Sequence, residues 1–134
     1  MAFDIKKTNL AEQAEAGYEF EVKLPDGSPT DFYITVRGNL SPKVKKFSKD
    51  LFNQLQLKEL QAKRKGKADQ PVDLDEAEET LVKSAVARIV TWKGLEDGGK
   101  VVEPTQENFV RIMTELDWVR KQVLDESDND ANFI

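Results

Sequence analysis

The stretch 18-YEFEVKLPDGSPTDFYITV-36 carries the strongest local signal for the fold. Apolar and polar side chains alternate in residues 18–24 and again in residues 32–36, and the PDGSPTD segment between them is rich in turn formers. Alternation with a period of two on both sides of an Asp-Gly turn predicts a β-hairpin. An isolated hairpin is only marginally stable in water, so we expect its apolar face to pack on helices or on another chain.

The sequence after the hairpin predicts three amphipathic helices, because apolar residues recur there every three or four positions. We expect these helices to cover about residues 42–63, 73–92 and 105–123. Ser41-Pro42, Asp73 and Thr105 are the expected helix starts. In the first helix the apolar stripe consists of Val44, Phe47, Leu51 and Leu55, widened by Phe52, Leu57 and Leu60.

A chain of 134 residues suits one domain of ordinary size. The predicted fold class is α+β and mainly α, with the N-terminal hairpin and the three helices in one domain over residues 17–124. The polar residues 1–16 are interpreted as a flexible N-terminal arm. Residues 125–134 are interpreted as an acidic, flexible C-terminal tail.

The composition favours a protein that is not an enzyme. The chain contains no cysteine and no histidine, which removes most nucleophiles, neutral-pH bases and zinc ligands. The acidic segment 125–130 lacks the glycine and the distal glutamate of an EF-hand loop. We therefore expect no catalytic residues, no cofactor and no metal site.

The segment 94-GLEDGGK-100 matches the G-x-x-x-x-G-K pattern of a phosphate-binding loop, but its surroundings argue against that function. A true phosphate-binding loop follows a strand and places Ser or Thr after the lysine, whereas here a predicted helix precedes and Val101 follows. Glu96 and Asp97 would also repel a phosphate. We interpret Gly94 as the end of the second helix and Asp97-Gly-Gly99 as a tight turn.

Charge is segregated along the chain although the net charge is only −5. Nine basic and two acidic residues lie between Lys43 and Lys67, and five carboxylates follow between Asp73 and Glu79. We hypothesise that this basic face, with Lys45 and Lys49, meets an acidic surface of a neighbouring copy. A regulatory or nucleic-acid-binding protein that uses the basic helix 43–67 is the alternative, although no aromatic residues interleave with the lysines.

Three aromatic residues are further candidates for partner binding or self-association: Trp92, Trp118 and Phe133. Trp92 and Trp118 fall on or beside apolar helix stripes, which is also the pattern of core packing. Phe133 follows an acidic tail and is expected to dock either on its own chain or on a partner.

The second half of the chain resembles the tail assembly chaperones of long-tailed, siphovirus-like bacteriophages. The similarity rests on a helix that ends in Trp92-x-Gly94, a start at Pro104-Thr-x-Glu-Asn108, the segment Leu116-Asp-Trp-Val-Arg120 and the closing Asn129-Asp-Ala-Asn-Phe133. The PDG-type hairpin and Gly38-Asn-Leu-Ser41-Pro are compatible with the same family.

The resemblance implies a chaperone that binds and solubilises the tape measure protein, promotes tail tube assembly and is absent from the mature virion. It also implies self-association into an oligomer or spiral. Many members of the family are also made in a frameshift-extended form, and the resemblance implies contact with the tail tube protein through such a form. The implied location is the host cell cytoplasm. No apolar run approaches the roughly 20 residues needed to span a bilayer, so no membrane partner is expected.

Overall fold

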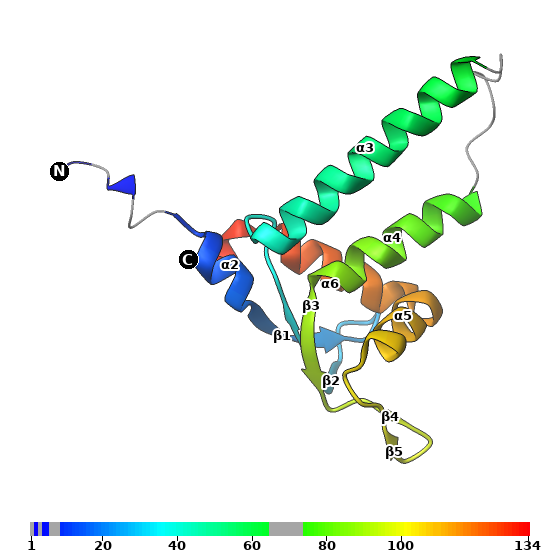
Figure 1. Cartoon of the computed structure of the whole chain (residues 1–134). Coiled ribbons are helices and arrows are strands. Elements are labelled where there is room, and N and C mark those ends of the chain that lie inside the picture. The colour runs from blue at the N-terminus through cyan, green and yellow to red at the C-terminus, as the bar shows by residue number, and fades with distance from the viewer. Residues whose placement is uncertain (1, 3, 6–8, 65–73) are drawn as a thin grey trace.

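The computed structural model describes residues 2, 4–5, 9–64 and 74–134, and its architecture is α+β with helices predominating (Figure 1). The predicted fold class is therefore confirmed. A three-stranded antiparallel sheet, ordered β1-β2-β3, lies against helices α4, α5 and α6, while helix α3 extends away from them (Figure 1). The predicted helix start at Asp73 lies outside the described residues.

The predicted hairpin is present as strands β1 (Tyr18–Lys23) and β2 (Pro29–Val36), which pair antiparallel. The side chains that alternate in the sequence point into the core: Phe20, Val22, Phe32, Ile34 and Val36 are all buried. The sheet therefore places its apolar face against the helices, as the period-two pattern predicted.

A third strand, β3 (Ile89–Lys93), completes the sheet by pairing antiparallel with β2, so that Ile34 lies opposite Trp92. The preceding helix α4 (Leu74–Arg88) ends before this strand. The prediction of a helix through Trp92 is wrong. The β-branched residues Ile89, Val90 and Thr91 favour a strand, and β2 offers them an unpaired edge.

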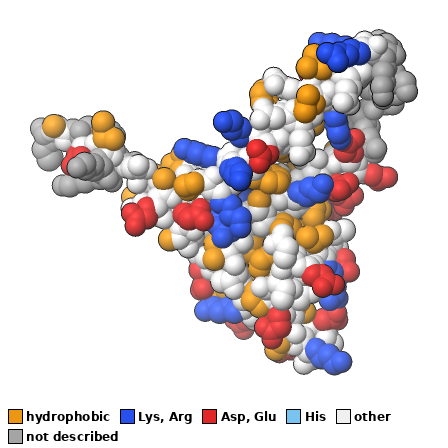
Figure 2. Space-filling model, viewed as in Figure 1, with side chains coloured by type: hydrophobic (Ala, Val, Ile, Leu, Met, Phe, Trp, Pro, Cys, Tyr) orange, Lys and Arg blue, Asp and Glu red, His pale blue; other side chains and the backbone are white. Residues whose placement is uncertain are grey.

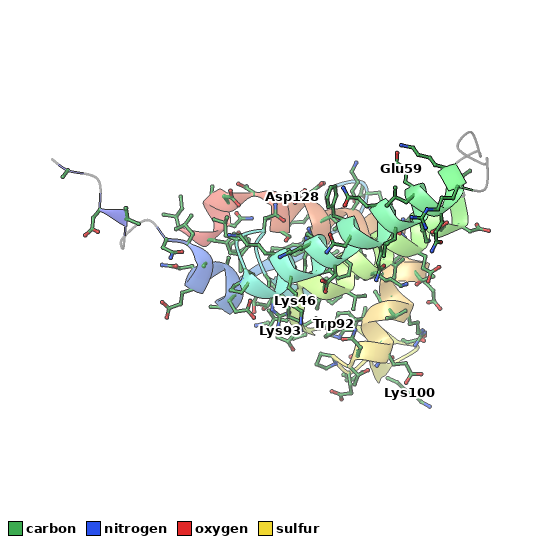
Figure 3. The ribbon with its side chains drawn as sticks, turned by 45° about the horizontal axis from the view of Figure 1, so that its top comes forward. Lys46, Glu59, Trp92, Lys93, Lys100 and Asp128 are labelled. Atoms are coloured by element: carbon green, nitrogen blue, oxygen red, sulfur yellow. The ribbon has the colours of Figure 1, made fainter. Side chains whose placement is uncertain are left out.

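Helix α3 (Pro42–Arg64) agrees with the prediction for residues 42–63. Its first turn is capped by Ser41, whose hydroxyl oxygen accepts a hydrogen bond from the Val44 amide. Only the base of the helix, around Val44, belongs to the core. The rest projects beside α4, and Figure 3 shows Lys46 near the base and Glu59 near the far end.

The predicted third helix is two helices, α5 (Gln106–Glu115) and α6 (Asp117–Asp128), so that prediction is wrong in part. Thr105 caps α5 as expected, through its hydroxyl and the Asn108 amide. Leu116 breaks the chain direction with φ −115° and ψ 78°. The break lets α5 and α6 both pack on α4.

The GLEDGGK segment forms a small hairpin of β4 (Glu96–Asp97) and β5 (Lys100–Val101). Gly98 and Gly99 have φ of 57° and 87° at its turn, which confirms the predicted tight turn. Gly94, however, follows strand β3 and not a helix. Its φ is 86°, and a Cβ added there would lie 2.2 Å from the Asp31 carbonyl oxygen.

Residues 11–16 and the C-terminal residues both pack on the body of the protein. Residues 11–16, which the sequence analysis placed in the N-terminal arm, form helix α2 (Ala11–Ala16) with Ala14 buried. In the predicted tail, α6 continues to Asp128 and a short 3-10 helix, η1 (Asp130–Phe133), follows. Phe133 is only 3% exposed and meets Tyr18 edge to face, so it docks on its own chain.

The edge strand β1 has one contact that resembles strand pairing. The side-chain amide of Gln122 on α6 accepts a hydrogen bond from the Lys23 amide at 2.9 Å and donates one to the Lys23 carbonyl at 2.8 Å. Gln122 thus occupies both main-chain hydrogen-bonding groups of Lys23 at the end of the sheet.

Candidate partner-binding surface

The most unusual surface of the molecule is the distal part of α3, residues 52–64, which we call the α3 projection. Four of its large apolar side chains are more than half exposed: Phe52 (60%), Leu55 (51%), Leu57 (59%) and Leu60 (53%). Figure 2 shows hydrophobic and basic side chains next to each other along this part of the molecule. Several large exposed apolar side chains on one element are typical of sites that bind a partner.

The exposed side chains lie on different sides of the α3 projection. Successive residues of a helix are separated by about 100°, so Leu57 and Leu60 share a face. Leu55 is two positions from Leu57 and five from Leu60, which places it about 140–160° from both. A helix with apolar residues on several sides is typically buried on several sides. The α3 projection therefore offers more than one contact face.

One of these faces forms a groove with α4. The groove has a volume of about 660 Å³. Its apolar side comes from α3 and consists of Phe47, Leu51 and Leu55. Its polar walls carry four carboxylates and two lysines, in addition to Gln54 and Thr80: Asp50, Asp75, Glu76, Glu79, Lys58 and Lys83. We call it the α3–α4 groove.

One ion pair joins the two sides of the groove, and a second lies along the α4 side. Lys58 on α3 pairs with Glu76 on α4, and Lys83 pairs with Glu79 along α4 at 3.1 Å. All four side chains are well exposed, so these pairs contribute little stability, on the order of 0–1 kcal/mol each. Carboxylates still outnumber lysines along the groove, and the groove is therefore net acidic.

The base of α3 is fixed to the body of the protein by polar contacts. Glu15 on α2 accepts hydrogen bonds from the Ser41 hydroxyl and from Arg37 Nε, the latter at 3.2 Å. The Ser41 hydrogen bond, with that of Arg37, holds the pKa of Glu15 below its ordinary value of 4.5. Arg37 also donates to the Ile89 carbonyl at 2.9 Å. These contacts link α2, α3 and β3 at the start of α3.

The structure separates the predicted partner-binding residues into two groups. Lys45 and Lys49 are exposed on α3, and neither has an ion-pair partner within the described part of the chain. Trp118 and Phe133 pack against the core or within it. The two groups are not brought together.

Trp92 is part of the core of the body, with 5% of its surface exposed. Its ring meets Phe32 and Phe109 edge to face, with centroids 5.7 and 4.8 Å away. Its Nε1 donates a hydrogen bond to the Val102 carbonyl at 2.9 Å. These contacts account for an aromatic residue at this position through packing alone.

The groove bears on the hypothesis that basic residues of α3 contact acidic residues of a neighbouring copy. Lys58 of α3 contacts Glu76 of α4 within one chain, so part of the basic helix is matched internally. The groove residues Asp50, Gln54 and Thr80 were not predicted as binding residues from the sequence. The feature that could have indicated them is that each lies next to a residue of the predicted apolar stripe of its helix.

Among the residues that the structure describes, no group of three or more His, Cys, Asp or Glu side chains is placed to hold a metal ion. Within the same part of the chain, no helix has the length and apolar character needed to cross a membrane. Comparison of the chain with models of protein families, with curated proteins and with solved structures finds no match.

Proposed function

We propose that this protein is a bacteriophage tail assembly chaperone that binds the tape measure protein, keeps it soluble and promotes assembly of the tail tube around it. It acts in the host cell cytoplasm, leaves before the virion is complete, and contacts the tail tube protein, a role that the resemblance assigns to a frameshift-extended form. The resemblance in the second half of the chain supports this family, and the α3 projection supports a binding function.

The observation that carries the proposal is the exposure of Phe52, Leu55, Leu57 and Leu60 on one projecting helix. Burying a large apolar side chain stabilises a complex by about 1.5–3 kcal/mol before the costs of association are subtracted. A long client helix with its own apolar stripe would cover such side chains by helix-to-helix packing. A chaperone needs this type of surface, because its client is insoluble without cover.

Within this proposal, Phe52 is the residue assigned to the client. It lies five positions before Leu57, so the two side chains point about 140° apart around the helix. Phe52 does not line the α3–α4 groove either. A client helix on the Phe52 side would therefore leave the Leu57 side free for other contacts.

Co-expression with a tape measure protein tests the proposal. We expect the natural chain to keep the tape measure protein soluble and to co-purify with it, and Phe52→Asp to lose both properties. Val110→Asp, at an exposed valine of α5, is the matched control and should behave like the natural chain. Equal behaviour of the two variants, or an insoluble tape measure protein beside the natural chain, would contradict the proposal.

The nucleic-acid alternative makes a different prediction. Binding through exposed lysines such as Lys45 and Lys49 would retard DNA in a gel-shift assay and would weaken steeply with added salt. Salt-dependent retardation by the natural chain, lost in a Lys45→Glu/Lys49→Glu variant, would favour that alternative over the chaperone.

A further inference from the structure

The side of α3 that faces away from Phe47, Leu51 and Leu55 of the groove has a regular composition, and Asp50, which lines the groove, lies at its edge. Residues spaced by three or four positions share this side, and all of them are exposed: Lys46, Lys49, Asn53, Leu57, Leu60 and Arg64. We call this set the outer face of α3. It carries two leucines and three basic side chains, and the basic ones have no ion-pair partner among the described residues.

The α3–α4 groove has the complementary composition. It presents apolar surface from Phe47, Leu51 and Leu55, which would bury leucines of an incoming helix. Its net acidic walls would attract basic side chains that flank those leucines. The ligand that fits the groove is thus a helix with apolar residues in one stripe and lysine or arginine beside them. The outer face of α3 is such a helix surface, and it is exposed on every copy.

From this complementarity we propose that the outer face of α3 in one copy binds the α3–α4 groove of a second copy. The alternative of two outer faces packed on each other would place like charges together, which is unfavourable. Two grooves facing each other would likewise oppose carboxylates. Charge therefore favours a contact between two different surfaces over a symmetric one.

A contact between different surfaces leaves one free outer face and one free groove at the ends of every dimer. Further copies can add at both ends, and such head-to-tail contacts form open helical assemblies unless the rotation closes a ring. This inference rests on the self-association included in the proposed function and assigns it an interface. It leaves Phe52 uncovered by the neighbour's groove contact, on the side given to the client.

Disulfide cross-linking between single-cysteine variants tests the interface directly, because the natural chain has no cysteine. Leu60→Cys marks the outer face and Thr80→Cys marks the groove. We expect a mixture of the two variants, distinguished by tags of different mass, to give disulfide-linked heterodimers under mild oxidation. Each variant alone should give few dimers, since neither surface meets itself. Sedimentation of the reduced variants checks that both associate like the natural chain.

Three outcomes would overturn the proposal. Dimers of Leu60→Cys with itself would show that outer faces meet each other. Dimers of Thr80→Cys with itself would show the same for grooves. A natural chain that stays monomeric at all concentrations in sedimentation, with no cross-links in the mixture, would show that the contact does not form. The cross-linking assay contains no tape measure protein, so its result is independent of client binding. If the heterodimers form but the co-expression test shows no binding of the tape measure protein, the proposed function is contradicted and this interface is not.

Charge reversal gives a second, independent readout. Lys46→Glu/Lys49→Glu should weaken self-association on the order of tenfold, since it removes two exposed ion pairs with the neighbouring groove and replaces them with like charges. Added salt should weaken the natural contact in the same direction. Lys100→Glu is the control, because Lys100 is exposed on the β4–β5 hairpin away from α3 (Figure 3). Equal association of the double variant and the control at low salt would contradict the electrostatic basis of the contact.

Discussion

The body of the protein, formed by the β1-β2-β3 sheet with α4, α5 and α6, buries most of its large apolar side chains, whereas the α3 projection leaves four of its own exposed. Both regions carry amphipathic patterns in the sequence. The difference is that the body contains enough elements to cover most of its apolar surface, whereas in the described part of the chain α4 is the main element beside the projection. Apolar residues in the body therefore set the stability of the fold, and those on the projection are available to partners.

The largest expected effect on stability comes from truncating a side chain of the body, and the matching truncation on the projection tests whether the two regions differ. Trp92→Ala removes a buried ring from contacts with Phe32 and Phe109 and should lower the free energy of unfolding by about 3–5 kcal/mol. Leu57→Ala, on the projection, should change it by less than about 0.5 kcal/mol. Urea denaturation of both variants measures this. Similar losses would show that the projection also stabilises the fold.

The second test asks whether the C-terminal residues belong to the body. Phe133→Ala should destabilise the protein by about 3 kcal/mol, because the ring is buried against Tyr18 and above Gly38. The neighbouring Ile134 is 90% exposed, so Ile134→Ala is a control expected to have no measurable effect. Thermal melting compares the two. An unchanged melting temperature for Phe133→Ala would place these residues outside the stabilising core.

The third test separates backbone conformation from crowding within the body. Gly94 and Gly27 have nearly the same φ, 86° and 89°, but only Gly94 has a backbone carbonyl where a Cβ would go. Gly27→Ala should cost about 1 kcal/mol for the left-handed conformation alone. Gly94→Ala should cost roughly 2 kcal/mol more, because strands β2 and β3 must shift apart. Equal costs in chemical denaturation would mean that the sheet accommodates the methyl group.

The smallest expected effect concerns the junction between the body and α3. The pKa of Glu15 is lowered in the folded state, mainly by the Ser41 hydrogen bond, so its carboxylate contributes stability above pH 4.5 that is lost as pH falls through the folded-state pKa. Glu15 is partly exposed, so Glu15→Gln should cost no more than about 1 kcal/mol at pH 7. The variant should also lose less stability than the natural chain between pH 5 and pH 3, which denaturation at the two pH values measures.

The sequence predicted the hairpin and α3 well because each depends on a local signal: alternation around a turn, and a Ser-Pro start before a periodic stripe. It failed at Ile89–Lys93. Ile89 and Trp92 are both buried and three residues apart, a spacing that also fits a helix. That spacing arises because the pairing of β2 with β3 shifts register between Thr35 and Val36. Only a tertiary partner reveals such an irregularity.

The binding surface was partly predictable for a similar reason. Leu55 and Leu60 lie five residues apart, which already places them on different sides of one helix. The sequence shows the wide stripe, but it does not show how few of the described elements lie beside α3 to cover it. The burial of Trp92 and Phe133 depends equally on contacts between segments distant in the sequence, such as Tyr18 with Phe133.

The contact of Gln122 with Lys23 has a consequence for how copies of this chain can grow into larger assemblies. An edge strand is a template on which a foreign strand can add, and uncontrolled addition leads to aggregates. The Gln122 side chain of α6 hydrogen-bonds both the main-chain amide and the carbonyl of Lys23, so these two groups are not free to pair with another strand at that end of β1. The proposed contact between copies uses helical surfaces instead, and such contacts depend on side-chain shape and charge and are weakened by added salt.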